Sequence, residues 1–276
     1  MLDLAVTAIK NGYYHFDCAE GKFNPSSVSK IGGGNTYALS AYFNETGIGA
    51  GIKASGVERE KMFIASKAVG SHGQDIQSAL EISLEKLDVD YLDLYYIHIP
   101  WSAQTDEELQ RIWAEMEKIK ESGKARSIGV SNFDKEHLEI ILRTAKIVPA
   151  INQIEYHPYR QYEDLIPFMR EKGIAIAAYS GLTPILAARP GPLDDTYAEL
   201  AAKYGVTEAD IEFRWLLDQD IVVITTSKKE ERIQQYLTSL PGFRLEEEDF
   251  KRITETGKQK TYKGPYEEFM RKYYCF

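Results

Sequence analysis

Polar or aromatic side chains follow all but the last of the apolar runs of this sequence, at the point where each of these runs stops. The positions that share this placement are Asp17, Lys67, His98, the pair Ser131–Asn132, Gln153, and the pair Tyr179–Ser180. A lysine ammonium favours the ionised form of a nearby acid, a carboxylate can hold that lysine in place, and an imidazole can donate a hydrogen bond to a substrate oxygen. The first three residues therefore indicate proton transfer to a polarised oxygen, and no metal is expected.

A second group of residues is suited to binding an anion. Ser227, Lys228, Lys229 and Arg232 follow the last apolar run, at the start of a predicted helix. A helix N-terminus and its cations both attract negative charge. The alternative is a solvated, charged helix start, since Glu230 and Glu231 partly neutralise the cations.

The elements that must position these residues alternate regularly along the chain. Strands are predicted at Tyr14–Asp17, Met62–Ser66, Leu92–Ile97, Ser127–Val130, Ile151–Glu155, Ile174–Tyr179 and Ile221–Thr225. Amphipathic helices are predicted at Leu2–Lys10, Asp75–Leu87, Asp106–Glu121, Lys135–Ala145, Tyr162–Glu171 and Lys229–Leu240. Such β–α alternation over 276 residues predicts a parallel sheet and favours one (β/α)8 TIM barrel, in which functional residues lie at the C-terminal strand ends.

Composition narrows the class of protein. The chain carries 33 Lys and Arg against 42 Asp and Glu, a net charge of −9, which disfavours nucleic acid and anionic membranes as partners. Its two cysteines, Cys18 and Cys275, allow no disulfide framework or cysteine-based zinc site and fit a reducing compartment. No apolar run is long enough to cross a bilayer. We therefore expect a cytoplasmic enzyme.

Six segments in order, GYYHFDCAE, FIASK, DLYYIHIP, GVSNF, NQIEYHPY and AAYS, closely resemble the aldo-keto reductases. The resemblance implies an oxidoreductase of aldehydes or ketones with a catalytic tetrad of Asp17, Tyr42, Lys67 and His98. Tyr42 enters through AYFNE, which matches the family's tyrosine-x-asparagine-glutamate pattern. A tyrosine, with a pKa of about 10, becomes a useful acid at neutral pH only beside a group that stabilises phenolate, such as the Lys67 ammonium.

The same resemblance implies the cofactor NADPH. It assigns Ser131, Asn132 and Gln153 to the nicotinamide carboxamide and Tyr179, with Ser180 beside it, to the nicotinamide ring. It assigns Ser227, Lys228, Lys229 and Arg232 to the adenosine 2′-phosphate. The chain departs from the family where Glu-Asn often contacts adenine, because Gln235 and Tyr236 stand there.

Two departures affect the predicted organisation, a single barrel domain over residues 1–276. Tyr42 lies 25 positions after Asp17, whereas family members place it five after, and removing Gly21–Ser40 restores the family spacing. This atypical insertion at residues 21–40 is either a retained intron or a native insertion. In addition, the chain starts within the helix Leu2–Lys10, so the N-terminal hairpin and first strand of the family are expected to be missing and activity to be impaired.

The partner expected from these patterns is a small carbonyl substrate. FDCAE, AYS and TTSKKEER are similar to the fungal reductases of conjugated polyketones and dehydropantolactone, which points to a conjugated dicarbonyl. Substrate choice is expected to depend on the loop Gly181–Leu193 and the tail Tyr262–Phe276, and the protein is expected to be a monomer or a weak dimer. Two other interpretations stay open, a cofactor-binding regulatory barrel and a mispredicted, inactive product.

Overall fold

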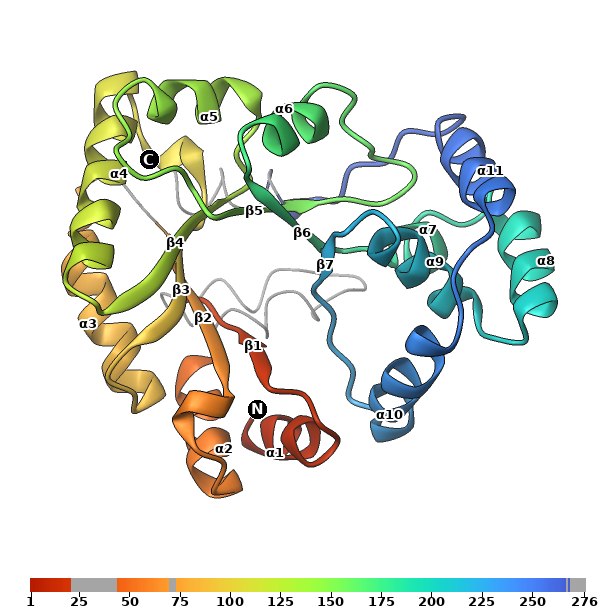
Figure 1. The fold of residues 1–276 in the computed structure, drawn as a ribbon, viewed down its shortest axis with the longest axis horizontal. Helices are drawn as coiled ribbons and strands as arrows, with labels where there is room; N and C mark the ends of the chain where they lie inside the picture. Colours follow the sequence, from red (N-terminus) through yellow and green to blue (C-terminus); the bar gives the residue numbers. More distant parts are fainter. Residues whose placement is uncertain (21–43, 70–72, 267, 269–276) are drawn as a thin grey trace. The chain divides into compact units, whose positions relative to one another are not determined.

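The computed structural model describes residues 1–20, 44–69, 73–266 and 268. The segment 21–40 and Tyr42 therefore lie outside the described residues. The chain forms two compact units (Figure 1). Within the described residues, unit 1 comprises Met1–Ser131 and Glu136–Pro149, and unit 2 comprises Asn132–Lys135 and the chain from Ala150 onward.

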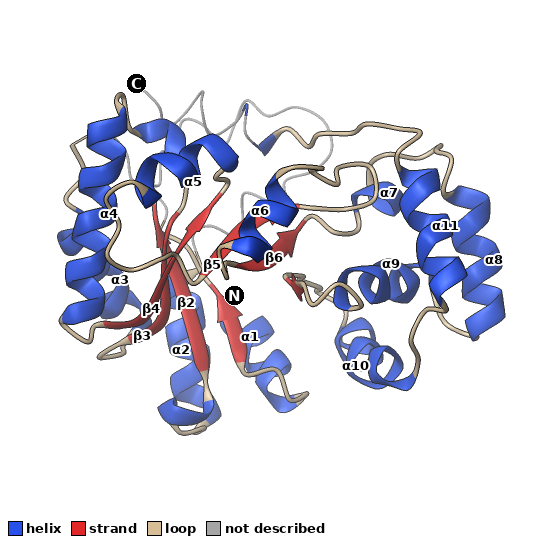
Figure 2. Ribbon diagram, turned by 45° about the horizontal axis from the view of Figure 1, so that its top comes forward, coloured by secondary structure: helices blue, strands red, loops and turns tan. Residues whose placement is uncertain are grey.

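Unit 1 is a parallel sheet of four strands with helices on its outer side (Figures 1 and 2). Its strands are β1 (His15–Asp17), β2 (Phe63–Ala68), β3 (Leu92–Ile97) and β4 (Ala125–Ser131), which pair in chain order. Its helices are α1 (Leu2–Lys10), α2 (Glu45–Ser55), α3 (Ile76–Leu87), α4 (Asp106–Glu121) and α5 (Lys135–Leu142), with short 3-10 turns at Arg59–Lys61 and Pro100–Ser102.

Unit 2 contains three further parallel strands and six helices among its described residues. The strands β5 (Ile151–Glu155), β6 (Ala175–Tyr179) and β7 (Val222–Val223) again pair in chain order. The helices are α6 (Leu165–Glu171), α7 (Thr183–Leu186), α8 (Asp194–Tyr204), α9 (Glu208–Leu217), α10 (Glu230–Ser239) and α11 (Glu247–Gly257), and a 3-10 turn covers Leu240–Gly242.

The residues at the helix ends explain where several helices begin and stop. Asp75 and Thr105, the N-cap residues of α3 and α4, accept hydrogen bonds from the backbone amides of Gln77 and Glu108. Gly123 follows α4 with φ +80°, a left-handed conformation that costs glycine little. The predicted alternation of strands and helices is confirmed, and it places the ends of β1, β2 and β3 side by side.

Candidate functional site

Asp17 and Lys67 form a buried ion pair at the C-terminal ends of β1 and β2. The Lys67 Nζ lies 2.5 Å from Asp17 Oδ2, and it donates a second hydrogen bond of 3.0 Å to the carbonyl of Cys18. The Lys67 side chain is only 1% exposed, so these partners replace the water that would otherwise solvate its ammonium group. The ion pair fixes a positive charge at the strand ends.

His98 directly follows β3 and lies close enough to Lys67 for the two side chains to interact electrostatically. Its backbone amide donates to the carbonyl of Ala68, and its side chain is buried. Burial first, and the Lys67 charge second, hold the pKa of His98 well below its usual value of 6.5. The imidazole is therefore neutral at neutral pH and presents one N–H as a donor. The structure thus brings together Asp17, Lys67 and His98.

Asn44 and Glu45, which follow Tyr42 closely in the sequence, form hydrogen bonds with the chain at the ends of β1 and β2. The buried amide of Asn44 accepts a hydrogen bond from the Ala19 N–H and donates one to the Asp17 carbonyl, at 3.4 and 3.3 Å. The carboxylate of Glu45 accepts from the Ser66 hydroxyl at 2.7 Å. The AYFNE motif contains both residues, but no role was predicted for either. Tyr42 itself lies outside the described residues.

In unit 2, Asn132, Gln153 and Tyr179 meet. Asn132 has a left-handed backbone (φ +62°), its N–H donates to the Gln153 carbonyl at 2.9 Å, and its side-chain oxygen accepts from the Tyr179 hydroxyl at 2.6 Å. Tyr179 ends β6 half-buried, and Ser180 after it is also left-handed (φ +57°). In this arrangement the Tyr179 ring is held at its hydroxyl end by Asn132 and lies beside amide groups. Ser131, which ends β4 and is buried, belongs to unit 1.

The predicted anion-binding residues surround the start of α10. Ser227 accepts a hydrogen bond from the N–H of Lys229, the N-cap residue of α10, at 3.0 Å. Lys228, Lys229 and Arg232 are exposed. Among the described residues, no ion pair involves Lys229 or Arg232. These two charges, next to the positive end of the helix dipole, suit an anion from solution.

Gln235, one turn further along α10, contacts the protein itself. Its amide donates to Thr207 at 3.1 Å and to Asp210 at 2.8 Å, and these two residues form the capping box at the start of α9. The Ser239 hydroxyl donates to the same Asp210 carboxylate. These bonds fix α10 against α9, which holds the cations at the helix start in place.

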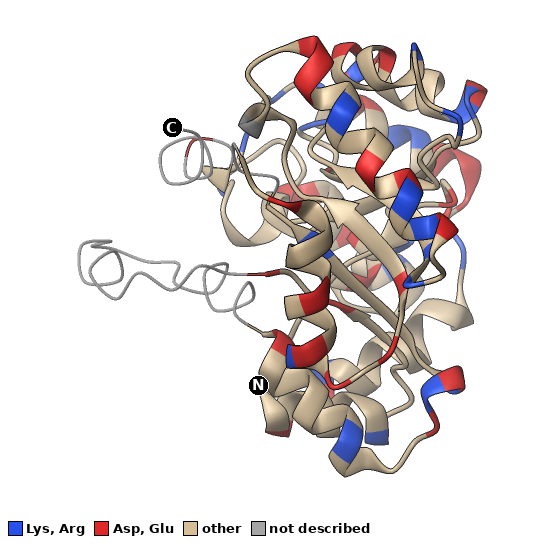
Figure 3. Cartoon of the chain, turned by 90° about the vertical axis from the view of Figure 1, so that its left-hand side faces the viewer, with Lys and Arg blue, Asp and Glu red and all other residues tan. Residues whose placement is uncertain are grey.

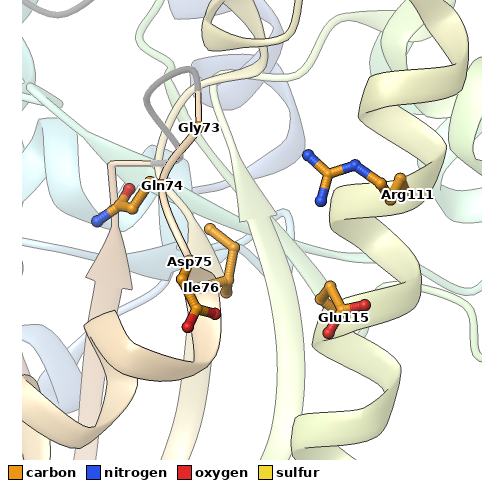
Figure 4. Close-up of a pocket in the computed structure, with 6 residues that line it drawn as sticks. All are labelled: Gly73, Gln74, Asp75, Ile76, Arg111 and Glu115. Atoms are coloured by element: carbon orange, nitrogen blue, oxygen red, sulfur yellow. The ribbon is translucent and has the colours of Figure 1, made fainter.

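Other features of the described residues do not belong to these groups. A pocket of 310 Å³ lies between the start of α3 and the middle of α4, lined by Gly73, Gln74, Asp75, Ile76, Arg111 and Glu115 (Figure 4). None of the predicted site residues lines it. The described part of the chain contains no cluster of His, Cys, Asp and Glu that could hold a metal ion. None of its helices combines the length and apolarity needed to cross a membrane.

Comparisons with known proteins agree with this pattern. A family model described as the aldo/keto reductase family matches residues 1–258. The NAD/NADP-dependent indole-3-acetaldehyde reductase of Schizosaccharomyces pombe is 34% identical over 94% of this chain and 84% of its own. The glyoxal reductase of Bacillus subtilis is 37% identical over 89% and 79%. An aldo-keto reductase of Bombyx mori, solved in complex with NADP, has a TM-score of 0.79 and 30% identity, and covers 99% of this chain and 87% of that chain.

Proposed function

Because this chain belongs to the aldo/keto reductase family, we propose that it reduces the carbonyl group of small aldehydes and dicarbonyls with NADPH, with Tyr42 as the proton donor. The chain is an NADP-dependent oxidoreductase by that membership. Its parallel strands and its likeness to solved members fit a (β/α)8-barrel-like fold. A single domain over residues 1–276 stays a prediction.

The substrate class rests on the named relatives together with the polar group of unit 1. The relatives include reductases of indole-3-acetaldehyde, glyoxal and methylglyoxal, all small carbonyl compounds. In this chain the neutral His98 can donate a hydrogen bond to a carbonyl oxygen and orient it, as in other sites that polarise a reacting oxygen. The proposed substrates include conjugated dicarbonyls, because the FDCAE and AYS segments are similar to those of fungal reductases that act on such compounds.

The observation that carries the mechanism is the buried pair of Lys67 and Asp17. A cation held at the strand ends lowers the cost of forming a phenolate nearby, which makes Tyr42 a stronger acid. Asp17 orients the Lys67 ammonium through their direct contact. NADPH, when bound, supplies the hydride that reaches the carbonyl carbon. The proton from Tyr42 then completes the alcohol, so that one C–H bond and one O–H bond form.

The residues assigned to the cofactor lie in unit 2, apart from Ser131, and they fit its chemistry. We assign the carboxamide to Ser131, Asn132 and Gln153, and the ring to the half-buried Tyr179 beside Ser180. The adenosine 2′-phosphate is assigned to Ser227, Lys228, Lys229 and Arg232. The exposed cations at the start of α10 support this, since Lys229 and Arg232 are not paired with carboxylates within the described residues. Gln235 is bonded to Asp210 and is therefore not assigned to adenine.

The test is NADPH oxidation with methylglyoxal, phenylglyoxal and a simple aldehyde, combined with a separate measurement of NADPH binding. Tyr42→Phe should abolish turnover while NADPH binds nearly as before, because the ring of Tyr42 is retained and only the proton is lost. Tyr14→Phe, a change at an exposed tyrosine, is the matched control. Turnover that survives Tyr42→Phe would refute the role of Tyr42. NADPH binding without turnover of any carbonyl would instead favour a regulatory barrel.

A further inference from the structure

The chain after α11 returns to the ends of β5 and β6 in unit 2 and is held there at three points (Figure 1). We call residues 260–266 the C-terminal strap. The Lys260 ammonium donates to the carbonyls of Ala188 and Pro190, at 2.5 and 2.9 Å. The N–H of Tyr262 donates to the Tyr159 carbonyl at 3.2 Å. The third point is made by a buried side chain at the end of β5.

That side chain is Glu155, the last residue of β5. Its Oε1 accepts a 2.8 Å hydrogen bond from the backbone N–H of Gly264, and its side chain is only 3% exposed. Arg160 donates to Oε2 at 2.8 Å, and His157 Nε2 lies 3.3 Å from Oε1. Burial alone would raise the pKa of Glu155, but the His157 hydrogen bond and the Arg160 charge outweigh it and lower that pKa. The strap is therefore bound by a charged carboxylate, which is a strong acceptor.

Gly264 is the residue that this close approach requires. A Cβ added at position 264 would lie 2.8 Å from Glu155 Oε1, well inside ordinary contact distance. A side chain there would force the strap and the carboxylate apart, so one of the two would have to shift. This pair cannot be recognised in the sequence, because its two members stand 109 positions apart.

Two residues beyond Gly264, the strap brings an aromatic ring to the cofactor group of unit 2. The ring of Tyr266 packs edge-on against that of Tyr179, with the centroids 5.4 Å apart and the planes at 61°. Glu155 and Tyr179 are register partners on β5 and β6. The carboxylate that holds the strap and the ring that the strap contacts therefore lie on neighbouring strands, and Asn132 fixes the other end of Tyr179.

We propose that Glu155 is a positioning residue whose bond to Gly264 holds Tyr266 against Tyr179, and that this contact slows the release of NADPH. The inference rests on the proposed function, in which Tyr179 stacks on the nicotinamide ring. Asn132 restrains the hydroxyl of Tyr179, and Tyr266 restrains its ring. A ring held at both ends loses less conformational freedom on binding, so the complex is longer-lived.

The test measures two quantities on the full chain, the dissociation rate of NADPH by stopped-flow fluorescence and hydrogen exchange of the strap without cofactor. Glu155→Gln keeps the shape but cannot accept from both Gly264 and Arg160 as a charged group. We expect faster exchange at Gly264 and about tenfold faster NADPH release, the scale of one lost charged hydrogen bond. Gly264→Ala, which alters only the strap, should have the same effects.

Two further variants separate positioning from general damage. Tyr266→Phe keeps the ring and should retain the wild-type release rate, whereas Tyr266→Ala should release NADPH as fast as Glu155→Gln. Glu255→Gln, at an exposed carboxylate paired with Lys258, is the matched control. Unchanged release in Glu155→Gln and Gly264→Ala, with the strap loosened, would overturn the inference but leave the proposed function intact. If the wild type did not bind NADPH, the proposed function would fail first, whatever the exchange data showed.

Discussion

At the residue scale, the surroundings of His98 determine how the protein responds to acid. Burial and the Lys67 charge lower the pKa of His98, so the folded protein resists protonation there. Below pH of about 6.5 the unfolded chain binds a proton at this histidine that the folded chain does not, and folding loses stability as the pH falls. As the pH falls, the free energy of unfolding should decrease more steeply in the wild type than in His98→Gln. The difference between the two slopes should be up to about 1.4 kcal/mol per pH unit. Urea unfolding at pH 5 and pH 7 measures this, and equal pH dependences would contradict it.

Glu212 gives the opposite pH dependence. It is fully buried on α9 and hydrogen-bonded to the Tyr197 hydroxyl, and burial raises its pKa to about 8. A raised pKa means that its contribution to stability is complete below the unfolded pKa of about 4.3 and is lost as the pH rises through the folded value.

We therefore expect Glu212→Gln, which cannot ionise, to gain stability relative to the wild type as the pH rises from 5 to 8. The gain should be up to about 1.4 kcal/mol per pH unit. Denaturation at pH 5, 6.5 and 8 provides the measurement, and Glu199→Gln, at an exposed carboxylate of α8, is the control. A stability difference that does not vary with pH would show that Glu212 titrates normally.

At the element scale, one carboxylate holds together the N-terminal ends of three strands in unit 1. Asp93, on β3, accepts from the Ile64 amide of β2 at 2.9 Å. It also pairs with Arg59 at 2.8 Å and with Arg126 of β4 at 3.1 Å. The two guanidinium groups lie over the Tyr91 ring, at 3.9 and 4.1 Å from its centroid.

We expect Asp93→Asn to lower the free energy of unfolding by about 3 kcal/mol, because it leaves the mostly buried Arg59 without its counter-charge. Arg126→Met is the comparison. Arg126 is 55% exposed, so its loss should cost about 1 kcal/mol or less. Chemical denaturation of the two variants distinguishes these values, and equal losses would mean that burial does not control the strength of this cluster.

The predicted elements were right where the sequence pattern is local. Apolar runs predicted all the strands in the described residues, because strands covered on both faces need little from distant residues to be recognised. β7 is shorter than predicted, since Thr225 and Thr226 after it are exposed. Helices α2, α7, α8, α9 and α11 were not among those predicted. Of these, α8 and α11 are joined by Lys203 and Tyr204, which contact Asp249, and such a pairing between distant segments cannot be read from the sequence.

The site could be predicted in part for the same reason. Asp17, Lys67 and His98 each end or follow a predicted strand, and neighbouring strand ends of a parallel sheet must meet. Tyr42 depended on the resemblance alone and stays a prediction. The role of Glu155 could not be read, because Gly264, the residue that it holds, is distant in the sequence.

At the scale of the whole molecule, the net charge of −9 opposes an anionic ligand. Acidic and basic residues are interspersed along the helices (Figure 3), so attraction must come from a local group such as the start of α10. A ligand that binds the folded state alone stabilises the whole protein, by about 2.7 kcal/mol when present at 100 times its Kd. Thermal stability therefore reports on the cofactor without any knowledge of the substrate.

We expect NADPH to raise Tm more than NADH at equal concentration, because only NADPH carries the extra phosphate for Lys228, Lys229 and Arg232. Arg232→Ala should remove about 1.5–3 kcal/mol of the preference, the strength of one charge-assisted contact. Lys251→Ala, which removes an exposed cation paired with Glu247 on α11, controls for net charge and should keep the preference. Equal Tm shifts of the wild type with the two cofactors would exclude the start of α10 as the phosphate site. So would an equal loss of the NADPH preference in Arg232→Ala and Lys251→Ala, because a general effect of charge would weaken NADPH binding alike in both variants.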